Sequence, residues 1–290
     1  MIVVRLIGGL GNQLFQYALA RKLSVHLDTK VVLDITPYKK YKLHKYGLDN
    51  FNICSKIISG REKIFWYFKK IILFDKIFCI ISKKFRNAIY ITEQQFNFDK
   101  KIFLDSKKDT YLDGYWQSEK YFLDIRKNLL GDLIVSKQIE GKNLELSKQI
   151  NSVNSISLHV RRGDYVSNIK TAQVHGVCYL NYYYNAIDFL SKRIENPVLF
   201  IFSDDIEWVK ENLETTLKCI YVENNSANFN YEDLRLMSLC KHNIIANSSF
   251  SWWGAWLNNN PDKIVVAPKK WFNDSSINTK DLLPDDWVKI

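Results

Sequence analysis

The chain has 290 residues, of which 47% are apolar and 25% are charged, a composition that excludes an intrinsically disordered protein. Its net charge is +10, and residues 56–108 alone carry 13 lysines and arginines against 5 acidic residues. No run of eighteen apolar residues occurs, which argues against a membrane-spanning helix. The charge pattern favours an anionic ligand or membrane surface near residues 56–108 and disfavours a nucleic-acid-binding surface over the whole protein.

The number and spacing of the cysteines indicate the cellular compartment. There are five of them, an odd number, and none form a C-x-x-C motif. This pattern indicates buried thiols in a reducing compartment and argues against a disulfide framework or a zinc site. The chain enters an apolar segment at once, with Arg5 inside it and no small-residue cleavage site. We therefore expect no signal peptide and a cytoplasmic location.

A strand, a glycine-rich loop and a helix open the chain. The apolar, β-branched residues Met1–Leu6 predict a buried strand that leads into the loop Gly8–Gln13 and a helix at Leu14–Leu23. The loop lacks the third glycine of a G-x-G-x-x-G fingerprint. It is either a tight turn that packs the helix on the sheet, or a place where the backbone approaches a ligand, with Asn12 and Gln13 as polar contacts.

The rest of the first half is less regular. A second strand is predicted at Lys30–Ile35, and a helix with a wide apolar face and a basic edge at residues 64–84. That helix either packs on the core or lies on an anionic membrane surface. A strand with an aromatic loop follows at Thr110–Ser118 and a helix at Tyr121–Leu130, and we place a domain boundary near residue 150.

The second half alternates strands and helices, which predicts a doubly wound parallel sheet. Strands are expected at residues 156–160, 198–202, 219–222, 243–246 and 263–267, and helices at residues 181–193, 206–213, 231–241 and 252–257. The strand at 263–267 is expected to be the last.

Polar side chains follow three of these strands. Arg161 and Arg162 follow the first, Asp204 follows the second, and the turn Asn247–Ser251 precedes the last helix. Because ligands bind at the carboxyl ends of strands in open α/β sheets, we expect these groups to converge on one rim. Paired arginines suit a diphosphate, and a helix N-terminus can receive phosphate oxygens. The alternatives are surface ion pairs for the arginines and simple N-capping for the serines.

No metal site is expected at this rim. Asp204 and Asp205 lack the D-x-D spacing of metal-dependent nucleotide-sugar enzymes, and no cluster of histidines and cysteines occurs. If a nucleoside diphosphate leaves from the rim, the arginines must neutralise its charge.

Three motifs together resemble a known family. Residues 8–18 read GGLGNQLFQYA, residues 159–164 read HVRRGD, and residues 247–257 read NSSFSWWGAWL. In this order they resemble the α-1,2-fucosyltransferases of glycosyltransferase family 11. The resemblance implies an α/β, GT-B-like fold with two Rossmann-like domains facing across a cleft. Residues 1–150 would form the N-terminal acceptor-side domain, and residues 151–290 the C-terminal GDP-fucose-binding domain.

The resemblance also implies an activity. It is the inverting, metal-independent transfer of L-fucose from GDP-β-L-fucose to the 2-hydroxyl of a terminal galactose, in the synthesis of a bacterial surface polysaccharide such as O-antigen. No cofactor is implied. The partners would be GDP-fucose and a galactose-terminated oligosaccharide or lipid-linked glycan, without nucleic acid. Another nucleotide-sugar transferase of the same fold, with a different donor or acceptor, is the alternative.

The resemblance further assigns residues to the donor. The arginine loop would hold the diphosphate, and His159 would help to hold the nucleoside. Asp233 lies sixteen residues before Ser249, the spacing at which a carboxylate contacts guanine and a serine contacts phosphate in related enzymes. The alternative for Asp233 is an exposed helix carboxylate beside Arg235. The donor set is His159, Arg161, Arg162, Asp204, Asp233, Asn247, Ser248, Ser249 and Phe250, and the loop facing the cleft contributes Gly9, Gly11, Asn12 and Gln13.

Arg162, Asp164 and Asn12 are the candidate catalytic residues. Inversion requires a group that takes the proton of the acceptor hydroxyl. Asp164 is the first candidate for this base, and its alternative role is to orient Arg161 or Arg162. With a loose transition state and late proton transfer, Asn12 would instead orient the acceptor.

A basic, non-enzymatic nucleic-acid-binding protein fits the sequence less well. Such a protein would interleave aromatic side chains with positive charge on its surface. Here the aromatic residues of the basic region lie in long apolar blocks, which favours burial or peripheral contact with an anionic membrane.

Overall fold

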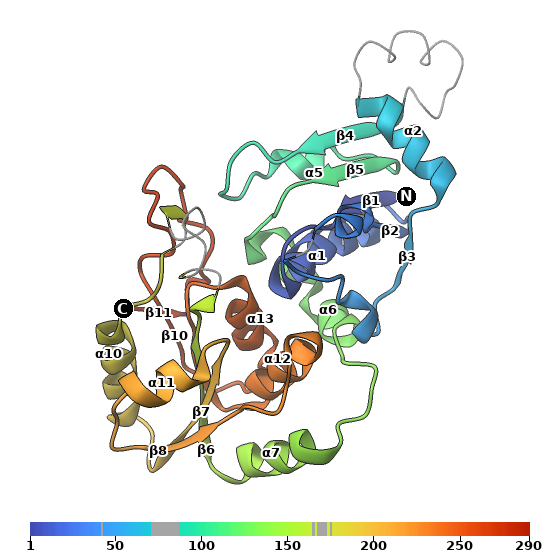
Figure 1. Cartoon of the computed structure of the whole chain (residues 1–290). Coiled ribbons are helices and arrows are strands. Elements are labelled where there is room, and N and C mark those ends of the chain that lie inside the picture. The colour runs from blue at the N-terminus through green and yellow to red at the C-terminus, as the bar shows by residue number, and fades with distance from the viewer. Residues whose placement is uncertain (42, 71–86, 164–165, 167–172, 175) are drawn as a thin grey trace. The chain divides into compact units, whose positions relative to one another are not determined.

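The structure is a computed structural model that describes residues 1–41, 43–70, 87–163, 166, 173–174 and 176–290. It divides into two units, each with its own sheet (Figure 1). Unit 1 comprises Met1–Ile134 with Asn278–Leu282, and unit 2 comprises Val135–Ile277 with Leu283–Ile290. The expected fold class, two α/β domains with parallel sheets, is confirmed.

Unit 1 is built on a parallel sheet with the strand order β3-β2-β1-β5-β4. The strands are β1 (Ile2–Arg5), β2 (Val31–Asp34), β3 (Ser55–Ile57), β4 (Ile89–Thr92) and β5 (Thr110–Asp113). The helices are α1 (Leu10–His26), α2 (Gly60–Lys70), α5 (Lys101–Asp105) and α6 (Arg126–Asp132), with 3₁₀ turns at Thr36–Lys39, Leu48–Asn50, Glu119–Tyr121 and Leu123–Ile125. The chain order reverses between β1 and β5, which makes this a topological switch point.

The first helix begins earlier than the sequence predicts. It starts at Leu10, so most of the expected glycine loop is helical. Gly8 ends the preceding turn with φ +86°, a conformation that glycine adopts without strain. Gln13 is fully buried, and its amide donates to the carbonyls of Gly8 (3.2 Å) and Lys45 (2.8 Å) and accepts from the N–H of Gly47 (2.9 Å). These tertiary bonds override the low helix propensity of the local sequence.

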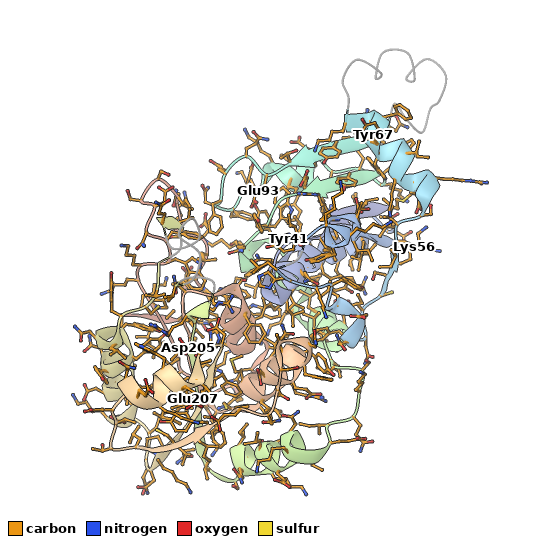
Figure 2. The ribbon with its side chains drawn as sticks, viewed as in Figure 1. Tyr41, Lys56, Tyr67, Glu93, Asp205 and Glu207 are labelled. Carbon is orange, nitrogen blue, oxygen red and sulfur yellow. The ribbon has the colours of Figure 1, made fainter. Side chains whose placement is uncertain are left out.

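Helix α2 covers one face of this sheet through Trp66. The Trp66 side chain is 2% exposed and packs on side chains of β1, β2 and β5. Ile64 and Tyr67 of the same helix are exposed, and Figure 2 labels Tyr67. The helix expected at residues 64–84 is described only as far as the end of α2, and residues 71–86 lie outside the described residues. Contact of this segment with a membrane therefore stays a prediction.

A short C-terminal segment, Asn278–Leu282, belongs to unit 1 and is anchored there by Asp281. The Asp281 carboxylate accepts from the N–H of Phe98 (3.2 Å) and pairs with Lys120 (2.6 Å), and its main-chain carbonyl accepts from the Ser118 hydroxyl (2.6 Å). The carboxylate is only 10% exposed, whereas the Lys120 side chain is 43% exposed, so the bond from the Phe98 N–H is the better shielded of the two.

Replacing Asp281 with alanine is expected to destabilise unit 1 by about 1–3 kcal/mol, because it leaves the partly buried main-chain N–H of Phe98 without its acceptor. Thermal melting followed by circular dichroism checks this. Asp285→Ala is the matched control, since Asp285 lies nearby in sequence and is exposed. Equal melting temperatures for the two variants would show that Asp281 does not anchor the segment.

Unit 2 is built on a parallel sheet with the order β11-β10-β9-β6-β7-β8. The strands are β6 (Asn154–Val160), β7 (Pro197–Ser203), β8 (Lys218–Tyr221), β9 (His242–Ile244), β10 (Val265–Ala267) and β11 (Val288–Lys289). The helices are α7 (Gly141–Ser152), α10 (Leu180–Ser191), α11 (Ile206–Asn212), α12 (Asn230–Leu239) and α13 (Ser249–Leu257), with a 3₁₀ turn at Ala227–Phe229. The expectation that the strand at 263–267 is the last is wrong, because β11 follows it and is too short to show an alternating pattern.

Helices cover both faces of this sheet, so the predicted doubly wound arrangement is confirmed (Figure 1). Successive side chains of a strand point to opposite faces. On β7, Leu199 and Ile201 pack with residues of α10 and α11, whereas Val198 and Phe200 pack with residues of α7 and α12. Helix α7 belongs to unit 2, because its Ile150 is buried against the sheet of that unit. The boundary between the two units therefore lies at residue 135, and not near residue 150 as the sequence predicts.

Candidate active site

The carboxyl ends of three neighbouring strands meet in unit 2. Arg161 and Arg162 follow β6, Asp204 follows β7, and the turn Asn247–Ser251 follows β9. The chain order reverses between β6 and β9, because β7 and β8 extend the sheet on one side and β9 to β11 on the other. Ligands bind at such switch points in open α/β sheets. The predicted convergence of the three strand ends is confirmed.

Asp204 holds the arginine loop in place. Its Oδ1 accepts from the main-chain N–H of Arg162 at 2.8 Å, and its Oδ2 pairs with Nη1 of Arg161 at 2.8 Å. Gly163 approaches the same carboxylate closely, and a Cβ atom at that position would lie 2.3 Å from Asp204 Oδ2. Asp204 therefore orients the arginine loop, and its direct contact with the donor stays a prediction.

Arg162 is fixed by α11 as well. Its Nε pairs with Oδ2 of Asp205 at 3.0 Å, and its Cζ lies 3.6 Å from the ring centroid of Trp208 (Figure 2 labels Asp205). A guanidinium stacked on an indole keeps its plane fixed and its charge intact. Sequence reasoning missed Trp208, although its spacing of three residues from Asp205 places both on one side of the first helical turn.

The N-terminus of α13 offers main-chain donors to an anion. Ser248 is the N-cap, and its hydroxyl accepts from the N–H of Phe250 at 3.3 Å. Ser249 is the first helical residue. The N-capping interpretation is thus correct for Ser248. It is compatible with phosphate binding, because the other N–H groups of the first turn and the helix dipole remain directed at the rim.

The Asn247 side chain forms hydrogen bonds with two loops around the site. Its amide nitrogen donates to the carbonyls of Gly176 (3.2 Å) and Trp271 (3.0 Å), and its oxygen accepts from the thiol of Cys178 (3.4 Å). The side chain is 3% exposed. We therefore revise the expected donor contact by Asn247 to the positioning of two loops.

His159 lies beneath the rim as a neutral imidazole. It is 4% exposed, its ring centroid lies 5.6 Å from that of Phe250, and its Nδ1 has no partner among the described residues. Burial, with a further contribution from the charge of Arg161, lowers the pKa of His159 to about 3. A neutral imidazole can donate one hydrogen bond and accept another, which suits contact with a nucleoside and not charge neutralisation of a phosphate.

Asp233 lies in the first turn of α12, which packs against α13. It is partly buried, and its Oδ1 accepts from the Asn225 amide at 2.7 Å. Burial raises the pKa of Asp233 to about 7, against the opposing effect of Asn225. The alternative of a carboxylate that stands exposed beside Arg235 is wrong, because Arg235 pairs with Glu232 (Nε to Oε2, 2.9 Å).

The start of α1 lies beside the switch point of unit 1. Asn12 is partly exposed, and its Oδ1 accepts from Nε2 of Gln117 at 2.8 Å. Gly9 precedes the helix, whereas Gly11 is buried within it. Gln13 is fully buried and bonded to main-chain atoms, so its expected contact with a ligand is revised to a structural role.

Asp164, the candidate base, lies outside the described residues, and its role stays a prediction. Within the described ranges, no three histidine, cysteine, aspartate or glutamate side chains gather as a metal site requires. In the same part of the chain, no helix is long and apolar enough to cross a membrane.

A doubly wound sheet with paired arginines and a helix N-terminus at its switch point is the arrangement at which open α/β proteins bind phosphate-containing ligands. The whole chain, residues 1–290, matches the model of glycosyl transferase family 11. The protein therefore belongs to this family and is a glycosyltransferase.

Two Escherichia coli proteins are similar over the whole chain. The chain is 40% identical to an α-1,2-colitosyltransferase, with 100% of this chain and 99% of that protein covered. It is 34% identical to the O-antigen biosynthesis glycosyltransferase WbnK, with 98% of each covered. A galactoside 2-α-L-fucosyltransferase of Bos taurus is more distant, at 25% identity over 50% of this chain and 41% of that protein.

Solved structures share the fold. The NodZ α-1,6-fucosyltransferase soaked with GDP-fucose has a TM-score of 0.53 at 17% identity, with 88% of this chain and 92% of that chain covered. The fucosyltransferase NodZ from Bradyrhizobium has a TM-score of 0.52 at 16% identity, with 87% and 91% covered. These neighbours confirm the GT-B-like fold class.

Proposed function

We propose that the protein transfers L-fucose from GDP-β-L-fucose to the 2-hydroxyl of a terminal galactose, with inversion at the anomeric carbon. The observation that carries this proposal is the pair of arginines at the switch point of unit 2, both fixed by carboxylates that follow β7. Arg161 and Arg162 stay charged throughout the physiological pH range, so they neutralise the departing diphosphate without a metal ion. The α-1,2-linked sugar in the name of the 40% identical relative supports the linkage.

The chemistry requires three events. The acceptor hydroxyl attacks the anomeric carbon from the face opposite the diphosphate, the glycosidic carbon–oxygen bond to GDP breaks, and the hydroxyl proton leaves. The arginines and the first turn of α13 receive the charge that develops on the diphosphate. Asp164 remains our candidate for the group that takes the proton, and Asn12 our candidate for orienting the acceptor.

GDP-colitose is the second candidate donor. Colitose is L-fucose without its 3-hydroxyl, and the full-length similarity to an α-1,2-colitosyltransferase favours it. The two donors share the GDP moiety, so the residues of the arginine loop, α12 and α13 would serve either one. Groups near the 3-hydroxyl of the sugar would decide between them.

Donor turnover with lactose as acceptor tests the proposal. GDP release is measured from GDP-fucose and from GDP-colitose, with UDP-galactose as the control donor and EDTA present throughout. We expect acceptor-dependent GDP release and a 2-linked sugar on the galactose of lactose. A higher kcat/KM for GDP-colitose would select the second donor. Release from UDP-galactose, or no nucleotide release and no GDP binding, would contradict both donors.

We further propose a cellular setting. The relative named for O-antigen biosynthesis supports a role in building a surface polysaccharide, with a galactose-terminated or lipid-linked glycan as acceptor. A lipid-linked acceptor would lie at a membrane surface, and the anionic cytoplasmic leaflet attracts basic segments such as residues 56–108, so we propose a cytoplasmic enzyme with peripheral membrane contact there.

A further inference from the structure

Two asparagines from different elements converge on Asp233. Asn143 of α7 and Asn225, which follows β8, form a reciprocal amide pair, with nitrogen-to-oxygen distances of 2.9 and 3.0 Å. The nitrogen of Asn225 also donates to Oδ1 of Asp233 at 2.7 Å. Asn224 adds a donor to the Asn143 oxygen at 2.7 Å.

The amide pair determines which way the Asn225 side chain faces. One N–H of Asn225 bonds to the Asn143 oxygen, which leaves the other N–H for Asp233. Turning the amide over would place its oxygen against the Asp233 carboxylate and break both bonds of the pair. The orientation of the Asp233 carboxylate is thus determined from α7, a separate helix.

Both oxygens of Asp233 retain acceptor sites for a ligand, because a carboxylate has about four lone-pair sites and Asn225 fills one of them. Among the described residues, Oδ1 accepts from Asn225, and Oδ2 has no hydrogen-bond partner in the protein. Asp233 lies at the carboxyl edge of the sheet, in the first turn of the helix that follows β8. This is the edge at which the arginine loop and the α13 N-terminus also lie.

We propose that Asn143 and Asn225 are positioning residues that hold the Asp233 carboxylate for the N1–H and 2-amino groups of a guanine base. The inference rests on the proposed function, since it assigns the recognition of the donor's base to this cluster. Guanine offers two parallel donors on one edge, and an ionised carboxylate offers two acceptors. A uracil base offers only one N–H there, between two carbonyl oxygens that would face the carboxylate. The cluster therefore selects guanine.

Base recognition then depends on pH. Burial raises the pKa of Asp233 to about 7, the Asn225 bond opposes that rise, and the charge of Glu232 adds to it. Glu232 lies on the same helix and is paired with Arg235, and Asn225 is the neighbour from the β8–α12 loop. Below about pH 7 the protonated carboxyl can no longer accept from both guanine donors, so affinity falls. Loss of the Asn225 bond moves this fall to higher pH.

Binding of GDP and of inosine diphosphate, measured by calorimetry between pH 6 and 8.5, tests the inference. The two nucleotides carry the same phosphates, so the ratio of their Kd values isolates the 2-amino group. We expect the wild-type protein to prefer GDP by at least about tenfold above pH 8, the factor expected for one charge-assisted hydrogen bond. The preference should decline below pH 7. In Asn225→Ala it should be mostly lost at pH 7 and reappear only at higher pH.

Three further variants complete the test. Asn143→Ala keeps the direct bond to Asp233 but frees the amide, so we expect an intermediate loss. Asp233→Asn should remove both the preference and its pH dependence. Asn185→Ala, an exposed asparagine of α10, should bind as the wild type does.

The outcomes distinguish a failure of the proposed GDP-linked donor from a failure of the positioning role of Asn143 and Asn225. If the wild-type protein binds UDP as well as GDP, the proposed guanine-linked donor fails. If it binds GDP selectively, but Asn225→Ala and Asn143→Ala keep the wild-type ratio and pH profile, the positioning role is wrong. Persistence of the pH dependence in Asp233→Asn would also overturn it.

Discussion

Replacing Arg162 with alanine is expected to lower kcat/KM for sugar transfer by about 10²–10³-fold, the loss typical of removing one preorganised group that stabilises transition-state charge. The fold should survive. The side chain of Asp205, its ion-pair partner, is 41% exposed, so the pair contributes about 1 kcal/mol or less to stability. The effect should therefore appear in catalysis and GDP affinity and not in the melting temperature.

Arg193→Ala is the matched control for this experiment. Its guanidinium also stacks on an aromatic ring, with Cζ 3.6 Å from the Phe189 centroid, but it lies at the end of α10, away from the arginine loop. Initial rates with GDP-fucose and lactose, GDP titration and thermal melting are compared for both variants. If Arg162→Ala keeps more than about a tenth of the wild-type activity, Arg162 does not stabilise the departing diphosphate.

The fold was largely predictable because the long, buried strands of a parallel sheet are also the most apolar segments. The bounds of strands β6 and β7 were expected to within two residues, and their carboxyl ends were placed on one rim. Strands β3 and β4 were missed. They are short strands at the two edges of the unit 1 sheet, with partly buried or exposed side chains, so neither shows a clear hydrophobic pattern.

The candidate site was predictable in its charges but not in their connections. The sequence indicated that Arg161 and Asp204 meet, but not that one carboxylate holds both arginines. The pairing of Asn143 with Asn225 spans 82 residues and follows no spacing rule. Such contacts depend on how helices pack across a sheet face, which local propensity and periodicity do not encode.

Gly163→Ala is expected to lower kcat/KM by about 10²-fold through a single added methyl group, the loss typical of misplacing a catalytic group by about an ångström. The new Cβ would lie 2.3 Å from Oδ2 and 3.0 Å from Cγ of Asp204, closer than atoms in contact can approach. The carboxylate must move, and both of its oxygens hold the arginine loop. The substitution therefore displaces Arg161 and Arg162 together without touching either side chain.

A double-mutant cycle with Asp204→Ala separates this mechanism from general damage. If Gly163→Ala acts by displacing the Asp204 carboxylate, the double variant should be no less active than Asp204→Ala alone, because the group that clashes is already absent. Gly131→Ala in α6 is the control: a Cβ there meets nothing within 4 Å, and replacing a helical glycine should raise stability by about 0.5–1 kcal/mol. Additive losses in the cycle would mean that the methyl group harms the loop by another route, and that Asp204 does not transmit its effect to the arginines.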